Sequence, residues 1–396
     1  MKWFRDIGPG ILIAAAFIGP GTVTLCTIAG ASFGYSLVWA IILSIFSTIV
    51  LQEMSLRIGL ITKMNLAEVI RINIKSKFLS RLFLILIISS ILIGNAAYEA
   101  GNITGASLGI SAILNTQNIN YIPIFIGFIA FIILYQGDYK VLERSLVFLV
   151  LIMSISFFIT AIITKPDINA LINGVITPKI DLNNLPIILG LIGTTVVPYN
   201  LFLHSSLVSE KWNSVNKLKV ARFESFFSIL IGGLVSLSII ITAASVNNKD
   251  VNGVVDLAKG LEPLYGNFAI YFLGIGLFAS GITSSITAPL AAAYVAKSCF
   301  GWQDSLKSRK FRAIWIIILI IGVLVSMVRM NPIEIIKFAQ FSNSLLLPII
   351  AIILLWLINN KNIISDKYSY RYQNILGLLI VIISLILGTK GLISLI

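Results

Sequence analysis

Two prolines interrupt long apolar segments of the chain, at places where the backbone could bind a solute. The first interruption reads Gly19-Pro20-Gly21-Thr22 and the second reads Val197-Pro198-Tyr199-Asn200. Proline removes a backbone N–H and clashes with the preceding helical turn, and glycine weakens a helix further. Each interruption therefore predicts a helix that stops and restarts, which leaves carbonyl groups without partners in their own helix. Such carbonyls, together with nearby hydroxyl groups, are oxygen ligands for a cation.

One acid, Glu99, lies near the centre of another apolar segment. Asn95, Tyr98, Glu99 and Asn102 follow one another at i, i+3, i+4 and i+7, so they share one helix face. An ionisable group at mid-membrane is costly to bury and is functional by default. We therefore expect Glu99 to accept protons or to balance the charge of a cation. The alternative is a protonated glutamate with a structural hydrogen bond.

Further polar side chains are candidates for the same pathway. Thr194 and Thr195 precede the second interruption and could offer hydroxyl oxygens, unless they only cap the broken helix. His204 follows that interruption and could relay protons, although a single histidine is more often structural. Gln340 and Asn343 are spaced i, i+3 in a late apolar segment, where they either line the pathway or bridge helices.

Two other patterns have structural interpretations. Ser280, Ser284 and Thr287 follow at i, i+4 and i+7, which predicts a close-packing helix face. Glu53 precedes Arg57 by one turn, which predicts an ion pair within one helix. Neither pattern is expected to bind a solute.

The composition places all of these residues in a membrane protein. Of the 396 residues, 58% are apolar and 11% are charged, whereas a soluble domain has about 25% charged residues. One histidine and two cysteines exclude a multi-histidine metal cage and a disulfide framework. The chain carries no P-loop lysine motif, no His-Glu-x-x-His and no Cys-x-x-Cys, so neither an enzyme nor a cofactor is predicted.

Apolar stretches of about 20 residues, the length that crosses a bilayer, occur eleven times. They cover residues 7–32, 35–57, 82–112, 121–137, 142–164, 184–208, 222–246, 266–297, 312–328, 333–358 and 375–395. With the N-terminus inside, 22 of the 29 Lys and Arg residues lie on the cytoplasmic side. Because cytoplasmic loops are enriched in Lys and Arg, the net charge of +13 indicates orientation and not nucleic-acid binding. The N-terminus is predicted to be cytoplasmic and the C-terminus outside.

The two interruptions also predict the domain organisation. Pro20 and Pro198 are 178 residues apart, and each lies in the first span of a five-span half. Five spans per half place the second half upside down, and paired interruptions in inverted halves indicate the binding site of a transporter. We predict a single all-α membrane domain, with a first repeat over 1–165, an inverted repeat over 166–360 and an extra helix over 361–396.

Several segments resemble the Nramp family of proton-coupled divalent metal transporters. These segments are Gly8-Pro9-Gly10, Phe33-Gly34-Tyr35, Leu51-Gln52-Glu53, Arg57-Ile58-Gly59, Asn200-Leu201-Phe202-Leu203-His204-Ser205 and Gly281-Ile282-Thr283-Ser284-Ser285. The resemblance covers spans 1 to 10 and implies a LeuT-like fold, in which spans 1, 2, 6 and 7 rock against spans 3, 4, 8 and 9. It also implies that Glu99 is an acid of the proton route, with Asn102 in place of a second acid and His204 at a family histidine.

The metal site of that family is altered in this chain. In span 1 the family usually has Asp-Pro-Gly-Asn, where this chain has Gly19 to Thr22. In span 6 the family has a methionine and a histidine, where this chain has Val197 and Tyr199. A family alanine that offers its carbonyl corresponds to Thr194. Because soft sulfur favours transition metals and oxygen favours hard ions, we expect a hydrated, Mg²⁺-like cation held by backbone and hydroxyl groups at Gly19, Thr22 and Thr194. The predicted substrate-binding residues are Gly19, Pro20, Gly21, Thr22, Thr194, Thr195, Val197, Tyr199 and Asn200; Glu99, Asn102 and His204 are predicted for protons or gating, and Asn95, Gln340 and Asn343 for the lining.

Two other functions fit the same sequence. A small organic solute, such as an amino acid, would place its carboxylate at the N-termini of the half-helices. A membrane sensor that does not transport is the second alternative, and the retention of Glu99 and of both interruptions argues against it. In each case the expected partners are a small solute and the lipid bilayer, without nucleic acid, and the protein is expected to be a monomer in the plasma membrane.

Overall fold

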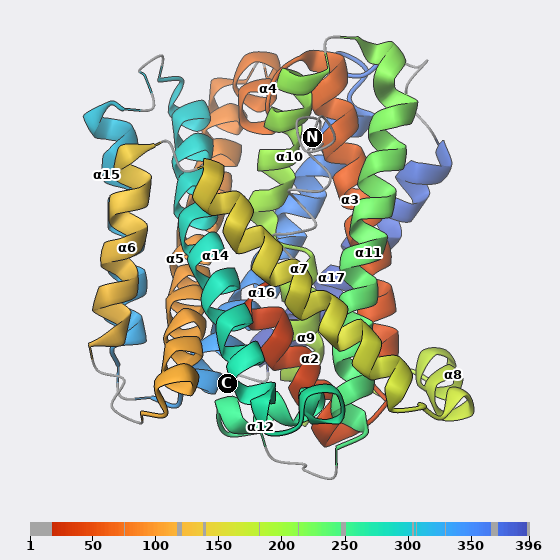
Figure 1. Ribbon diagram of the computed structural model, residues 1–396. Helices are drawn as coiled ribbons and strands as arrows, with labels where there is room; N and C mark the ends of the chain where they lie inside the picture. The colour runs from red at the N-terminus through yellow and green to blue at the C-terminus, as the bar shows by residue number, and fades with distance from the viewer. Residues whose placement is uncertain are drawn as a thin grey trace.

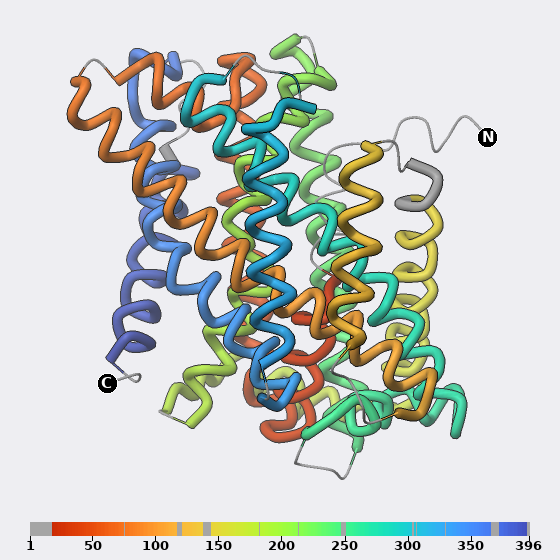
Figure 2. Tube along the Cα trace, turned by 90° about the vertical axis from the view of Figure 1, so that its left-hand side faces the viewer, coloured from red at the N-terminus to blue at the C-terminus, as the bar shows by residue number. Residues whose placement is uncertain are grey.

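The computed structural model describes residues 18–396 except 75, 117–120, 138–139, 182, 213, 247–250, 303–304, 306, 329, 366–370 and 394–396. Within these ranges the ordered elements are helices, without a β-strand. Long helices run roughly along one direction and form a single bundle (Figure 1, Figure 2). The all-α prediction is therefore confirmed.

The long helices coincide with the predicted spans. They are α2 (Pro20–Phe33), α3 (Val38–Thr62), α5 (Lys77–Leu114), α6 (Ile122–Gln136), α7 (Lys140–Ile163), α9 (Leu185–Thr195), α10 (Pro198–Lys211), α11 (Leu218–Ala244), α14 (Ala269–Phe300), α15 (Arg309–Ser326), α16 (Pro332–Asn359) and α17 (Arg371–Ile393). Among the described residues, eight helical segments are long and apolar enough to cross a membrane. The helix α6 is apolar but only 15 residues long, and α15 carries Arg309, Lys310 and Arg312 in its first turn.

Short helices lie at the two ends of the bundle. The helix α4 (Leu66–Asn73) lies at one end, with α8 (Ile168–Ile176) and α12 (Val254–Ala258) at the other (Figure 1). Asn65 starts α4, since its side-chain oxygen accepts a hydrogen bond of 3.0 Å from the N–H of Glu68. The two ends are called the α4 end and the α8 end below.

The helices α5 and α14 pack closely through small residues. A β-carbon added at Gly109 would lie 2.5 Å from the carbonyl oxygen of Gly274, and one added at Gly281 would lie 2.7 Å from the β-carbon of Ala106. Small residues let two backbones approach in this way, which adds van der Waals contact where the hydrophobic effect between helices is weak. This pair is the centre of one side of the bundle.

The helices α3 and α10 are joined by polar contacts instead. The Ser55 hydroxyl donates to the carbonyl of Leu201, and His204 Nδ1 lies 2.7 Å from Gln52 Oε1. At the α4 end, the Lys63 ammonium donates to the carbonyl of Trp212 over 2.6 Å. Each bond satisfies a buried or half-buried polar group inside the protein, as a membrane requires.

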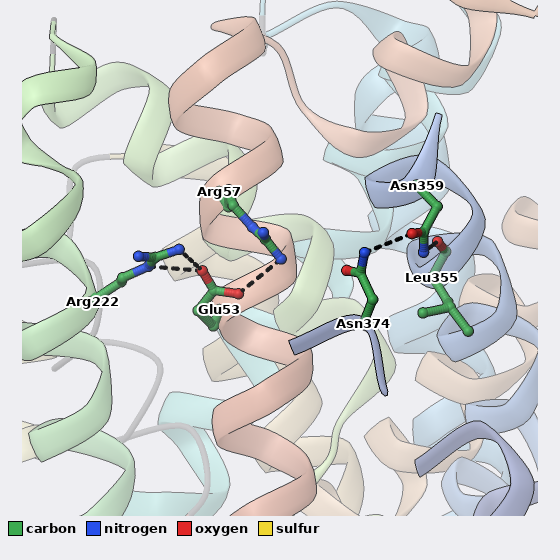
Figure 3. A network of polar contacts seen from close by, with 6 residues as sticks. All are labelled: Glu53, Arg57, Arg222, Leu355, Asn359 and Asn374. Carbon is green, nitrogen blue, oxygen red and sulfur yellow. Dashed lines mark hydrogen bonds and ion pairs between the residues drawn. The ribbon is translucent and has the colours of Figure 1, made fainter. Parts of the chain in front are cut away.

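A carboxylate links α3 to α11 at the same end of the bundle (Figure 3). Glu53 Oε1 accepts a hydrogen bond of 2.8 Å from Arg222 Nε and forms an ion pair of 2.6 Å with Arg222 Nη2, and Glu53 Oε2 lies 3.2 Å from Arg57 Nη2. The predicted pair of Glu53 with Arg57 is confirmed, and Arg222 extends it to a third charge. Because the Arg57 side chain is fully buried, it depends on this carboxylate for a compensating charge.

A second group of hydrogen bonds in Figure 3 joins α17 to α16. The side-chain amide of Asn374 on α17 donates to Asn359 Oδ1 on α16 over 2.6 Å, and Asn359 Nδ2 donates to the carbonyl of Leu355 over 2.8 Å. The helix α17 thus packs on α16 and lies at the edge of the bundle (Figure 2).

The Glu53 cluster gives a stability prediction. Glu53→Gln removes the carboxylate charge beside the buried Arg57, so we expect it to lower the free energy of unfolding by about 2 kcal/mol. Glu334→Gln is the matched control, because Glu334 pairs with Lys337 over 2.8 Å but is 53% exposed, and exposed pairs contribute little. Melting temperatures in detergent measure both variants. Equal melting temperatures for the two would contradict the role given to Glu53.

Candidate functional site

The second interruption is a break between α9 and α10. The helix α9 ends at Thr195, Val196 and Val197 have φ/ψ of −93°/74° and −84°/119°, and α10 begins at Pro198. The N–H of Val196 still donates to the carbonyl of Ile192 over 2.9 Å. Since proline has no N–H, Pro198 cannot donate to the Thr194 carbonyl four residues earlier. The sequence predicted this break correctly.

The first interruption is described from its second half onward. Gly19 is extended, with φ/ψ of −103°/177°, and α2 starts at Pro20, where the Val23 N–H donates to the Gly19 carbonyl over 3.2 Å. The predicted helical segment 7–17 lies outside the described residues. The helix therefore begins where the proline predicted it to begin.

Gln340 on α16 lies between the two interruptions. A β-carbon added at Gly21 would overlap the Gln340 side chain, and one added at Gly193 on α9 would overlap the Gln340 carbonyl oxygen. Pro20 is held from the other side, because a β-carbon at Gly105 on α5 would overlap its ring. Three glycines thus allow α2, α5, α9 and α16 to meet at the interruptions, and Gln340 contacts both broken helices.

Tyr98 reaches the same place from α5. Its ring contacts the ring of Tyr199 edge-on, with centroids 5.8 Å apart and an interplanar angle of 63°. A β-carbon added at Gly19 would lie 3.5 Å from Tyr98 Oη and 3.6 Å from Ser284 Oγ on α14. Both distances are ordinary van der Waals contacts. The Ser284 hydroxyl was predicted to belong to a packing face, so the sequence did not identify its position beside Gly19.

The Glu99 side chain contacts α15. The α15 residue Gly322 packs on its side chain, with a β-carbon position 3.0 Å from Glu99 Cβ, and Asn102 Nδ2 donates to Glu99 Oε2 over 3.4 Å. Asn95 Nδ2 donates to the carbonyl of Ala288 on α14 over 2.8 Å. The face predicted for Asn95, Tyr98, Glu99 and Asn102 is thus divided: Tyr98 contacts the broken helices, and the other three contact α14, α15 or one another.

His204 and Asn200 lie on α10 toward the α4 end. The His204 ring bonds to Gln52 Oε1 through Nδ1, while its Nε2 has no hydrogen-bond partner among the described residues. Both amide atoms of Asn200 also lack one there, and so do both amide atoms of Asn343. Gln52 was not identified from the sequence, because it is 152 positions from His204. Buried amides without partners are costly unless water or a ligand completes them.

The predicted site is closed to solvent. Twelve of the predicted residues are at most 2% exposed. They are Thr22, Asn95, Glu99, Asn102, Thr194, Thr195, Val197, Tyr199, Asn200, His204, Gln340 and Asn343. In the part of the chain that the structure describes, no group of three or more His, Cys, Asp or Glu side chains is arranged to hold a metal. The ligands that converge on the interruptions are neutral oxygens from hydroxyl, amide and carbonyl groups.

Comparison with known sequences relates the whole chain to one family. The model of the family described as natural resistance-associated macrophage protein-like, or Nramp, matches residues 10–394. The divalent metal cation transporter MntH of Staphylococcus aureus strain JH9 is 29% identical over 424 residues, which cover 98% of this chain and 90% of that protein. MntH of strain Newman gives the same values.

Comparison with solved structures shows the fold. The manganese transporter of Eremococcus coleocola, in complex with an aromatic bis-isothiourea substituted compound, superposes with a TM-score of 0.79 at 20% identity, covering 100% of this chain and 87% of that one. MhsT in complex with L-phenylalanine superposes with a TM-score of 0.60 at 15% identity, covering 98% of both chains. The fold is thus the LeuT-like arrangement that the resemblance to the Nramp family implied.

Gly193 and Gly19 are expected to differ in how much an added methyl group destabilises the protein. Gly193→Ala pushes α9 away from the α16 backbone, so we expect a loss of about 2 kcal/mol in the free energy of unfolding through overpacking. Gly19→Ala is the matched control, since its methyl group meets only ordinary contacts and its backbone is extended. Thermal unfolding in detergent measures both. An unchanged melting temperature for Gly193→Ala would show that α9 and α16 are not in close contact.

Proposed function

This chain belongs to the Nramp family, and from that premise we propose that it is a secondary transporter that carries a divalent metal cation across the membrane by alternating access. The observation that carries the proposal is the pair of interrupted helices, which meet around Gln340 in a chain related to the family over residues 10–394. Backbone carbonyls released at mid-membrane need partners inside the protein. A bound cation supplies one.

The packing of the bundle supports alternating access. Polar contacts join α3 to α10 and α11, and small residues join α5 to α14. The candidate site lies between these groups, with Tyr199 on α10 facing Tyr98 on α5. A movement of one group against the other would open the closed site to one side at a time.

We extend the proposal to a hard, hydrated ion of the Mg²⁺ type. Val197 offers no sulfur at the second interruption, and the groups that converge on the site are hydroxyl, amide and carbonyl oxygens. Oxygen ligands favour hard cations, and Mg²⁺ retains several of its waters in proteins. Without a carboxylate at Gly19, a retained hydration shell also reduces the cost of placing a divalent charge between uncharged groups.

The orientation and the repeats are further parts of this proposal. The basic residues Arg57, Lys63 and Arg71 gather at the α4 end, which supports a cytoplasmic position for that end. The N-terminus would then be cytoplasmic and the C-terminus outside, in a monomer of the plasma membrane. The first repeat would cover 1–165 and the inverted repeat 166–360, with α17 as the extra helix.

Uptake by the full-length protein in proteoliposomes tests the function. We expect Mg²⁺ to enter, with Mn²⁺ and Cd²⁺ entering less readily because the site offers oxygen and no sulfur. Empty liposomes are the control, and uptake is measured with and without a pH gradient. No movement of any of the three ions under either condition would overturn the proposal. Thermal stabilisation by an amino acid, without stabilisation by metals, would favour an organic solute.

The position of Glu99 leads to a prediction about the coupling of transport to protons. Glu99→Gln retains a hydrogen-bonding side chain against Asn102 but can no longer exchange a proton, so we expect transport to lose its dependence on the pH gradient. Glu334→Gln, at an exposed position of α16, is the control and should behave as the wild type. The measurement is the initial uptake rate at several external pH values. An unchanged pH dependence in Glu99→Gln would remove this residue from the coupling mechanism.

A further inference from the structure

One side chain of α5 touches both interrupted helices. Tyr98 is 2% exposed, its ring contacts Tyr199 in the first turn of α10, and its hydroxyl lies beside Gly19 at the start of α2. Glu99, the next residue, is rotated by about 100° around the helix and packs against Gly322. Tyr98 is therefore the α5 residue that faces the space between the interruptions.

Ser284 approaches that space from α14. The neighbouring hydroxyls of this helix bond back to its own carbonyls: Ser280 to Leu277 over 3.2 Å, Thr283 to Ala279 over 2.8 Å, and Thr287 to Thr283 over 2.8 Å. Ser284 makes no such bond among the described residues, although it is only 6% exposed. Its hydroxyl lies instead 3.6 Å from the position of a β-carbon at Gly19, opposite the Tyr98 hydroxyl at 3.5 Å.

The two hydroxyls border the space into which a longer side chain at position 19 would extend. A methyl group there would already be in van der Waals contact with both oxygens. Glycine keeps this space open, and the extended conformation of Gly19 does not itself require glycine. The surroundings of Gly19 thus carry two neutral oxygens in place of a charged group.

We propose that Tyr98 and Ser284 bind the transported ion and determine its specificity, through hydrogen bonds that their hydroxyl oxygens accept from the water shell of a hydrated divalent cation. A hydroxyl oxygen can accept a hydrogen bond from a metal-bound water and orient that water without stripping it from the ion. A carboxylate at position 19 would instead compete for direct coordination. The inference rests on the proposed function, since it assigns ligands to the same site.

Binding of Mg²⁺ and of Mn²⁺ to the purified full-length protein, measured by titration calorimetry, tests the assignment. We expect Tyr98→Phe and Ser284→Ala each to raise the dissociation constant for Mg²⁺ about tenfold and to change that for Mn²⁺ less. Tyr98→Phe keeps the ring contact with Tyr199, and Ser284→Thr keeps the hydroxyl and should retain wild-type affinity. Ser280→Ala and Tyr265→Phe are controls, because their hydroxyls are already bonded within the protein and their loss should leave binding unchanged.

The outcomes separate this inference from the function on which it rests. If the wild type binds no divalent metal, the proposed function fails and the assignment fails with it. If the wild type binds Mg²⁺ and both variants bind it equally well, the two side chains only pack, and the assignment alone is overturned. The assignment is also overturned if Ser280→Ala weakens Mg²⁺ binding as much as Ser284→Ala does. Should Tyr98→Phe not fold, the contrast between Ser284→Ala and Ser284→Thr decides.

Discussion

The structure depends on enclosing two peptide units that cannot form helical hydrogen bonds inside a membrane. Pro20 and Pro198 have no N–H, and lipid offers no replacement donor or acceptor. Both prolines are therefore enclosed by protein. Gly105 lets α5 close over Pro20, and Gly193 lets α16 reach the break between α9 and α10. The interruptions are tolerated because they meet each other, and they can bind a solute for the same reason.

The second constraint is the absence of negative charge where the helices break. The start of α2 and the start of α10 both present the partial positive charge of a helix N-terminus to their surroundings. Glu99, the acid of α5, packs against Gly322 and accepts a hydrogen bond from Asn102. A dehydrated divalent ion would meet little compensation there. An ion that retains its water, as we propose, would need less compensation from the protein.

Much of the fold could be predicted because apolar length and proline act locally. Within the described residues the predicted stretches matched the helices, Pro198 marked the break, and Glu53 with Arg57 formed the expected pair. Arg222 could not be predicted as the third member, because it is 169 positions from Glu53 and nothing local links them. Gln52 as the partner of His204 was missed for the same reason.

The candidate site was harder to predict because a helix face is broad. Residues at i, i+3, i+4 and i+7 cover an arc of about 100°, which is wide enough to touch different helices. Tyr98 and Glu99 lie at the two edges of that arc and so face different neighbours. The pattern of Ser280, Ser284 and Thr287 was similarly ambiguous. Two of these hydroxyls do bond back to their helix, and only the structure shows that Ser284 does not.

The position of α4 bears on how the two groups of helices can move. The N–H of Leu66 at its start donates to Ser205 Oγ on α10 over 3.3 Å, and the Arg71 side chain packs against Gly301 at the end of α14. This short helix therefore contacts both the group that contains α3 and α10 and the group that contains α5 and α14. Opening of the site toward the α4 end has to separate these contacts or turn α4 as a whole. Opening toward the α8 end does not, so the contacts of α4 keep the α4 end closed while the site opens toward the α8 end.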